Sequence, residues 1–520
     1  MTDILPSYIC GLWHHPADDG KVLLDAATAE PIVRVSSNPL DYPAVLSYAR
    51  TVGGPALRDM TFQQRGAALK ALGKYLSGRI PQLTELSLRT GATRRDSAID
   101  IDGGIGVLFV YASKGAKELP DQHILRDGDF EPLGKAGTFG VQHVLSPSLG
   151  AFVQINAFNF PVWGMLEKFA PAFLAGVPSV VKPASQTAYL TELTVREIVA
   201  SALIPDGALQ LVCARPDGML ESLTGQDVVS VTGSHETATA LRRHPTIAGN
   251  AVRFTAESDS LNSSILGEDA TAGSPEFEIF VRGLVTEMTQ KAGQKCTAIR
   301  RAFVPRALAD DVESAVCERL SKVTVGDPRD EAVRMGPLVG LGQRDDVRAA
   351  TAQLTNAGRI VFGSIESAPQ NLSLSADVHR GAFQSPVLLR FDDPQESEPH
   401  TIEAFGPVSS LLPYDSLDDA LQLVARGEGS LAASIVTSDA SIAHTAVAAA
   451  APWHGRLLVL NSDNAAESTG HGAAVPHAVH GGPGRAGGGE ELAGLRSLGH
   501  FMQRTAVQGS PDFLAELGRR

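Results

Sequence analysis

The chain has 520 residues, of which 43% are hydrophobic, a mean hydropathy of +0.01 and a formal net charge of −14. This length exceeds what one hydrophobic core supports, so we expect a globular protein of two or three domains. The acidic balance argues against a nucleic-acid partner, because phosphate binding requires clustered Lys and Arg. No apolar run reaches the roughly 20 residues that span a bilayer. The four cysteines form no CxxC pair and no basic, apolar leader is apparent, which predicts a cytoplasmic protein with reduced thiols.

Short apolar runs rich in β-branched residues begin near residue 151 and alternate with helical patterns. The predicted strands cover 151–155, 179–182, 209–213, 228–232 and 252–255, and the helices between them cover 163–174 and 187–202. Strands of this kind, separated by helices, are typical of a parallel sheet that is covered on both faces. The sequence therefore predicts an α/β protein with a Rossmann-like cofactor domain.

A second α/β unit begins near Phe277. Apolar residues at helical spacing from Phe277 to Met288 predict a helix that leads directly into the segment around Cys296. Further strands are predicted over 360–362, 386–389 and 457–460. The pattern predicts an α/β catalytic domain that follows the cofactor domain.

Three distant segments carry groups that belong together chemically: residues 292–297, 254–257 and 156–161. Cys296 offers a nucleophilic sulfur, Glu257 a carboxylate that can activate water, and Asn159 an amide N–H for a developing oxyanion. Each also has an ordinary interpretation: a small buried hydrophobic residue, a solvated loop carboxylate and a turn-forming Asn, respectively. Lys295 either lowers the thiol pKa or is solvated.

The order and separation of the Glu257 and Cys296 segments resemble those of the aldehyde dehydrogenase superfamily. The resemblance implies that Cys296 forms a thioester, that Glu257 is the general base and that Asn159 with the Cys296 backbone N–H holds the oxyanion. After Glu257 the superfamily usually has Leu-Gly-Gly-Lys, whereas this chain has Ser-Asp-Ser-Leu, which indicates a divergent branch. Because branches that pass the acyl group to coenzyme A typically lack the base, its presence favours release of a free acid.

The same resemblance implies a nicotinamide cofactor. Lys182 matches the lysine that holds the adenosine ribose, the turn at Gly233-Ser234 matches the pyrophosphate-binding turn, and Glu403 with its neighbour Phe405 matches the segment that binds the nicotinamide ribose. Relatives that prefer NAD commonly have Glu three residues after the lysine, where this chain has Ser185. A carboxylate there would repel a 2′-phosphate, so its absence favours NADP, with NAD retained as a possibility.

The resemblance also predicts the domain boundaries and the assembly. The NADP-binding domain comprises 1–126 and 146–256, the catalytic domain 257–480, and a small β oligomerisation element 127–145 and 481–520. In the superfamily, such a hairpin and tail strand join a neighbouring subunit's sheet, which implies a homodimer or a dimer of dimers.

Segments at 257–262, 481–485 and 500–511 resemble a narrower group, the semialdehyde dehydrogenases of aromatic catabolism through CoA thioesters. They imply a CoA-thioester semialdehyde substrate from benzoate degradation. Two alternatives stay open: an NAD(P)-dependent dehydrogenase of simple aliphatic aldehydes, and a Cys-dependent hydrolase or thioesterase without a redox cofactor. We expect no metal site, because His471, His477 and His480 lie in a Gly/Ala-rich loop without a carboxylate motif.

Overall fold

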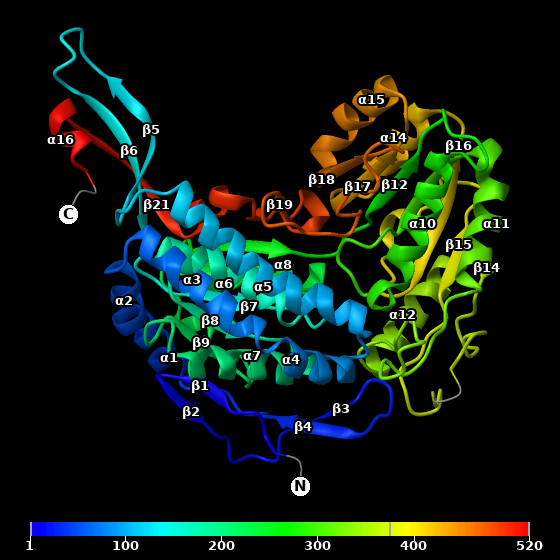
Figure 1. The fold of residues 1–520 in the computed structure, drawn as a ribbon, viewed down its shortest axis with the longest axis horizontal. Helices are drawn as coiled ribbons and strands as arrows, with labels where there is room; N and C mark the ends of the chain where they lie inside the picture. The colour runs from blue at the N-terminus through cyan, green and yellow to red at the C-terminus, as the bar shows by residue number, and fades with distance from the viewer. Residues whose placement is uncertain (1–2, 374–375, 518–520) are drawn as a thin grey trace.

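A computed structural model describes residues 3–373 and 376–517 of the chain. Residues 1–2 and 518–520 of the predicted terminal segments lie outside this description. Two seven-stranded sheets form the body of the molecule, and a separate three-stranded sheet projects from it (Figure 1). The predicted α/β fold class is confirmed.

The first sheet is the predicted cofactor sheet. Its strand order is β11-β10-β7-β8-β9-β1-β2, and the pairs among β11, β10, β7, β8 and β9 are parallel, while β1 pairs antiparallel with β9 and β2. The strands are β1 (Ser7–Ile9), β2 (Leu12–His14), β7 (Phe152–Ile155), β8 (Ser179–Lys182), β9 (Leu209–Leu211), β10 (Val228–Thr232) and β11 (Arg253–Glu257).

Both faces of this sheet are buried. Consecutive residues of one strand enter different hydrophobic clusters: Phe152 and Val181 pack in one, and Val153 and Val180 in the other. This explains why the strands read as continuous apolar runs rather than alternating ones. On the first face lie α2 (Gly54–Arg58), α3 (Phe62–Ser77), α4 (Ile80–Ser87), α5 (Arg94–Lys117), α6 (Trp163–Ala175) and α7 (Ala188–Ser201); on the second lie α1 (Tyr42–Tyr48), α8 (His235–Arg242) and α9 (Pro245–Gly249).

The strand order changes direction between β7 and β10. From β7 the chain continues to β8 and β9 on one side, whereas β10 and β11 lie on the other. Ligands of such sheets bind beyond the carboxyl ends of the strands at this switch point. Ile155 is in register with Lys182, and Thr232 with Glu257. The parallel register therefore brings the ends of these strands to one edge of the sheet.

The second sheet lies wholly within the predicted catalytic domain, in the order β14-β15-β16-β13-β12-β17-β18. The helices α10 (Pro275–Thr289) and α11 (Ala309–Leu320) cover one face, and α12 (Leu341–Leu354), α14 (Leu417–Ala425) and α15 (Ala440–Ala450) cover the other; α13 (Glu398–Thr401) is a single turn. The strands are β12 (Ser263–Leu266), β13 (Arg301–Pro305), β14 (Arg359–Phe362), β15 (Val387–Arg390), β16 (Val408–Tyr414), β17 (Ser430–Val436) and β18 (His454–Leu460).

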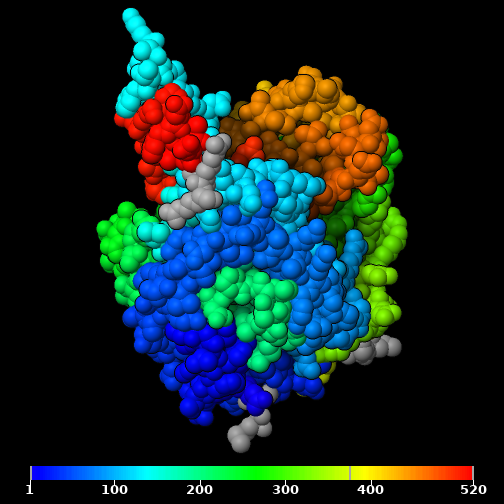
Figure 2. Space-filling model, turned by 60° about the vertical axis from the view of Figure 1, so that its left-hand side comes forward, coloured from blue at the N-terminus to red at the C-terminus, as the bar shows by residue number. Residues whose placement is uncertain are grey.

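The projecting sheet has the order β21-β6-β5 and consists of β5 (Leu125–Pro132), β6 (Gly140–Pro147) and β21 (Met502–Gly509). The hairpin and the C-terminal segment, which includes α16 (Pro511–Ala515), pack together at one corner of the molecule (Figure 2). Residues 481–500, which the sequence analysis grouped with this element, instead pack against β11 and α6. These residues contain β20 (Glu491–Leu492), which pairs with β19 (Val479–His480). Near the N-terminus, β3 (Lys21–Leu24) and β4 (Pro31–Val35) form a separate hairpin.

None of the helices within 3–373 and 376–517 combines the length and the apolar character that a membrane span requires.

Candidate active site

A pocket of about 580 Å³ draws its lining residues from both large domains. Asn159 from the loop after β7, Glu257 from the end of β11 and Cys296 from the loop after α10 all line it. The structure thus brings together the three residues that the sequence analysis selected for chemistry, although they come from segments far apart in the chain.

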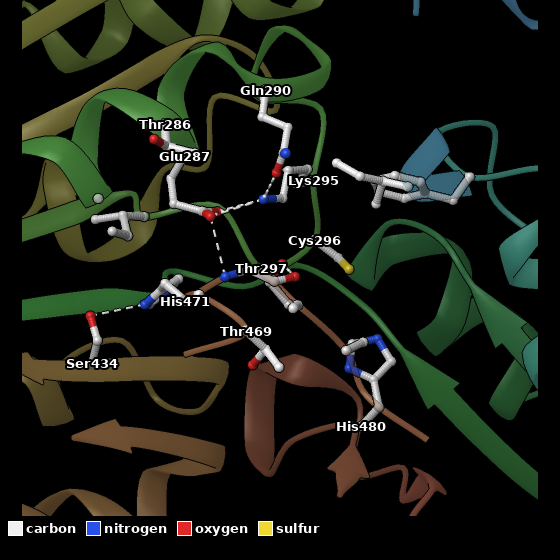
Figure 3. Close-up of a pocket in the computed structure, with 18 of the residues that line it drawn as sticks. Thr286, Glu287, Gln290, Lys295, Cys296, Thr297, Ser434, Thr469, His471 and His480 are labelled. Atoms are coloured by element: carbon white, nitrogen blue, oxygen red, sulfur yellow. Dashed lines mark hydrogen bonds and ion pairs between the residues drawn. The ribbon is translucent and has the colours of Figure 1, made fainter. Parts of the chain in front are cut away.

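The loop that carries Cys296 has an irregular backbone held by specific contacts. After α10 ends, Lys291 and Ala292 adopt positive φ angles, and Gly293 follows with a φ of 66°. A Cβ on Gly293 would lie 2.1 Å from the Gly406 carbonyl oxygen, so only glycine fits there. The Asn262 side-chain amide donates to the Cys296 carbonyl at 2.8 Å. These contacts fix the loop and direct the sulfur into the pocket (Figure 3).

Lys295 is neither solvated nor directed at the thiol. Its Nζ lies 2.8 Å from Glu287 Oε2 and donates to Gln290 Oε1 at 2.6 Å, and both ends of the ion pair are buried (Figure 3). The positive charge of Lys295 therefore neutralises the Glu287 carboxylate. The alternative that Lys295 is solvated was wrong, because its partner Glu287 lies eight residues earlier, on the preceding helix.

Cys296 faces a carboxylate and an imidazole at the centre of the pocket. The Cys296 sulfur, a Glu257 oxygen and a His480 ring nitrogen all lie within 4.8 Å of one another, and His480 Nε2 is 3.0 Å from Glu257 Oε2. Burial and the charge of Glu257 raise the pKa of the Cys296 thiol well above its usual value. The resting nucleophile is therefore a protonated thiol beside an ionised base.

The ionised state of Glu257 depends on its neighbours. Burial alone would raise the pKa of its carboxyl group, but the charge and hydrogen bond of His480, together with Lys168 and the thiol, outweigh burial and lower it to about 2. Burial and the charge of Arg456 act to lower the pKa of His480. The negative charges of Glu257 and Glu167, with the hydrogen bond to Glu257, outweigh these effects, so the pKa of His480 is raised. Each partner thus stabilises the charged form of the other.

A second layer of buried charge surrounds this pair. Lys168 Nζ lies 2.8 Å from Glu167 and 3.0 Å from Glu491, and carboxylate oxygens of Glu167, Glu257 and Glu491 lie within 4.8 Å of one another. The sequence analysis did not identify Glu167, Lys168 or Glu491, and it considered His480 only as a member of a metal cluster. His480 is in register with Glu491 in the β19–β20 pair, a neighbourhood that only the structure reveals.

Asn159 is buried beside the nucleophile loop. Its side-chain amide donates to the Gln294 carbonyl at 3.1 Å, which orients the group and leaves its second N–H for another acceptor. Within the described chain, the backbone N–H of Cys296 has no hydrogen-bond partner. An oxygen formed next to the sulfur can therefore meet two donors of the kind that stabilise an oxyanion.

The cofactor candidates surround the carboxyl edge of the first sheet, outside the lining of the Cys296 pocket. Lys182, at the end of β8, donates from Nζ to the Pro183 carbonyl at 2.7 Å, and Ser185 opens a short 3-10 turn. Within the described residues, a Cβ on Gly233 would meet no atom within 4 Å, which leaves room for a ligand against the backbone there. Ser234 caps α8 through the Thr237 N–H. This edge fits a dinucleotide.

Two carboxylates, Asp259 and Glu403, affect how the proposed cofactor site would bind a dinucleotide. The N–H of His235, at the start of α8, donates to Asp259 at 3.0 Å, so a pyrophosphate would share this helix end with a carboxylate. Burial raises the pKa of Glu403 to about 7, although Arg300, 3.3 Å away, opposes the shift. Phe405 packs edge-on against Phe158, with ring centroids 5.9 Å apart.

The three histidines that the sequence analysis weighed as a metal cluster have different surroundings. His471 Nδ1 lies 3.0 Å from the Ser434 hydroxyl, and burial lowers its pKa to about 4 (Figure 3). His480 faces Glu257 instead. His477 is not among the residues that line the pocket.

A doubly wound sheet, a second α/β domain and a half-buried Cys296 beside a buried Glu257 carboxylate make up the site. The aldehyde dehydrogenase family model matches residues 13–504, and the chain belongs to this family. It is 41% identical over 481 residues to the 3,4-dehydroadipyl-CoA semialdehyde dehydrogenase of Aromatoleum evansii, an alignment that covers 92% of this chain and 93% of that protein.

The fold is also that of solved structures. Betaine aldehyde dehydrogenase of Staphylococcus aureus, in complex with NAD+, superposes with a TM-score of 0.84 at 22% identity and 97% coverage of both chains. A 3,6-anhydro-L-galactose dehydrogenase in complex with NAP gives a TM-score of 0.84 at 21% identity, with coverage of 98% of this chain and 100% of that one. The family makes this chain an oxidoreductase that acts on aldehydes.

Proposed function

We propose that the protein oxidises a CoA-linked semialdehyde, 3,4-dehydroadipyl-CoA semialdehyde, to the free carboxylic acid with NADP, in aromatic degradation. The observation that carries the proposal is the Cys296 sulfur within 4.8 Å of the Glu257 carboxylate, in a pocket at the switch-point edge of a dinucleotide-type sheet. The identity to a CoA-linked semialdehyde dehydrogenase over nearly the whole chain supports the substrate.

The chain's own groups supply the acyl chemistry. Cys296 loses its proton to solvent and the thiolate attacks the aldehyde carbon, and the resulting oxyanion accepts hydrogen bonds from Asn159 and the Cys296 N–H. A bound NADP would supply the acceptor for the hydride that leaves this carbon, and Cys296 would then carry the acyl group as a thioester. Glu257, ionised at this stage, then takes a proton from water, whose oxygen attacks the thioester. Glu257 passes this proton to the departing sulfur, so that the acid is released and the thiol and the ionised base are restored.

His480 holds the general base in this scheme. A buried carboxylate that loses its partner becomes protonated and cannot accept a proton. The contact of 3.0 Å between His480 and Glu257 keeps the carboxylate ionised and limits its side-chain rotation. We assign His480 as a positioning residue, since it pairs with the Glu257 carboxylate and acts on the reaction through that group.

Lys182, Ser185, Gly233 and Ser234 would hold the adenosine ribose and the phosphates, and Glu403 the nicotinamide ribose. Ser185 leaves the position next to a 2′-phosphate uncharged, which favours NADP over NAD.

The projecting β21-β6-β5 sheet, with Leu133 and Phe139 exposed near the hairpin turn, supports assembly into a homodimer or dimer of dimers. A cytoplasmic location agrees with four cysteines that are all free.

Product analysis tests the proposal. With 3,4-dehydroadipyl-CoA semialdehyde and NADP, mass spectrometry should find a free carboxylate with the original CoA ester retained. Cys296→Ala should abolish oxidation and leave NADP binding nearly intact, and Glu257→Gln should give a burst of NADPH followed by slow turnover. A bis-CoA product would contradict release to water. Turnover without NADPH would favour the cofactor-independent hydrolase, and equal efficiency with simple aldehydes would favour the aliphatic alternative.

A further inference from the structure

The charged residues that line the active-site pocket divide into paired and unpaired groups. The carboxylates of Glu167, Glu257 and Glu287 each have a buried partner, respectively Lys168, His480 and Lys295. Paired charges of this kind are largely neutralised within the protein and attract a charged ligand only weakly.

Arg95 and Arg282 are the exception. Both line the pocket and both are exposed, and among the described residues neither guanidinium has a hydrogen-bond or ion-pair partner. Arg94, the immediate neighbour of Arg95, holds Glu85 at 2.7 Å. The chain has a net charge of −14, yet these two arginines add positive charge to one pocket without a neighbouring carboxylate to neutralise it. Such a charge attracts anionic ligands.

The two helices that carry these arginines both contribute residues to the pocket lining. From α5 the lining residues are Arg95 and Ile99, one turn apart, and from α10 they include Arg282, Gly283 and Thr286. The pocket is thus bordered by one face of each helix.

Arg282 lies towards the middle of α10, away from the end of the helix that leads to Cys296. The C-terminal end of α10 leads to the Cys296 loop, and Gln290, just past this end, also lines the pocket. Arg282 precedes Gln290 by eight residues, which is about 12 Å along the helix axis. A substrate with an aldehyde at Cys296 and an anionic group at its far end would therefore extend along α10 to bring that group to Arg282.

We infer that Arg95 and Arg282 bind the phosphate groups of a CoA-thioester substrate at the outer end of the pocket. This inference rests on the proposed function and names the residues that select its substrate class. Guanidinium groups suit phosphates because their N–H donors match pairs of phosphate oxygens. Binding energy gained there, remote from the reacting carbon, positions the aldehyde against Cys296.

The test compares two thioesters of the same semialdehyde, one with coenzyme A and one with N-acetylcysteamine, which has no phosphates. In the wild type, kcat/KM should favour the CoA ester, and added salt should reduce this preference. Each single variant, Arg95→Ala and Arg282→Ala, should lose about tenfold with the CoA ester, and the double variant about a hundredfold, mainly through KM. Turnover of the N-acetylcysteamine ester should change little. Arg94→Ala, which removes a charge outside the pocket, is the matched control.

A binding measurement separates recognition from catalysis. Calorimetry with desulfo-coenzyme A should detect binding to the wild type and to Arg94→Ala, and none to the double variant. If the double variant keeps the CoA preference, the assignment of the arginines is overturned while the proposed function stands. If the wild type shows no CoA preference, the CoA part of the proposed function fails and this inference fails with it. If the arginine variants lose kcat/KM equally with both esters, the assignment is also overturned. The same holds if they lose kcat/KM only with a short semialdehyde that carries a carboxylate in place of the thioester.

Discussion

Replacement of Glu257 by Gln should make the Cys296 thiol markedly more acidic. The sulfur and a Glu257 oxygen lie within 4.8 Å of each other, and the carboxylate is ionised because its pKa is lowered to about 2. At an effective dielectric constant of about 20, two unit charges at this separation repel by about 3.5 kcal/mol. This energy corresponds to about 2.5 pKa units, or a several-hundredfold change in the thiolate fraction at pH below the thiol pKa.

The rate of alkylation by iodoacetamide, followed by mass spectrometry of the Cys296 peptide from pH 6 to 11, measures this effect. The midpoint for Cys296 in the variant should fall by about 2 units or more relative to the wild type. Cys317 in the same protein is the internal control, because its pKa is raised by burial and Glu313 rather than by Glu257. A midpoint for Cys296 that moves by less than half a unit, or slower alkylation in the variant at neutral pH, would refute the electrostatic reasoning.

Three further changes give separate tests. Ser185→Glu should lower the kcat/KM ratio of NADP to NAD by about tenfold or more through repulsion of the 2′-phosphate; an unchanged ratio would show that Ser185 does not set the preference. His480→Gln should destabilise the fold by about 3 kcal/mol near pH 6 in urea titrations. Because the folded pKa of His480 is raised, its stabilisation is full below about pH 6.5 and is lost as the pH rises through the folded value, so the two proteins should converge above it. Gly293→Ala, whose Cβ would meet a carbonyl oxygen at 2.1 Å, should lower Tm by several degrees. Gly106→Ala should not, because its Cβ would meet no atom of another described segment within 4 Å.

Much of the fold could be predicted from the chain because its signals are local. The apolar runs from Phe152 and from Val228 are bounded by helical patterns, and their burial on both faces follows from that periodicity. The Cys296 and Glu257 segments were recognisable because each is contiguous and has a chemistry that depends on residue type. Their convergence in one pocket follows from the parallel register of β10 and β11 and from the helix that precedes the nucleophile loop.

The electrostatic setting of the site was decided only by tertiary structure. Nothing in the Gly/Ala-rich loop distinguishes His480 from His471, yet one faces the base and the other a serine hydroxyl. Lys295, next to the nucleophile in sequence, neutralises Glu287 instead of the thiolate. Charge interactions depend on through-space distance and on burial, and neither quantity is encoded in local spacing along the chain. Sequence therefore identified the residues that can react, whereas the packing of distant segments set their protonation states and the partners that hold them.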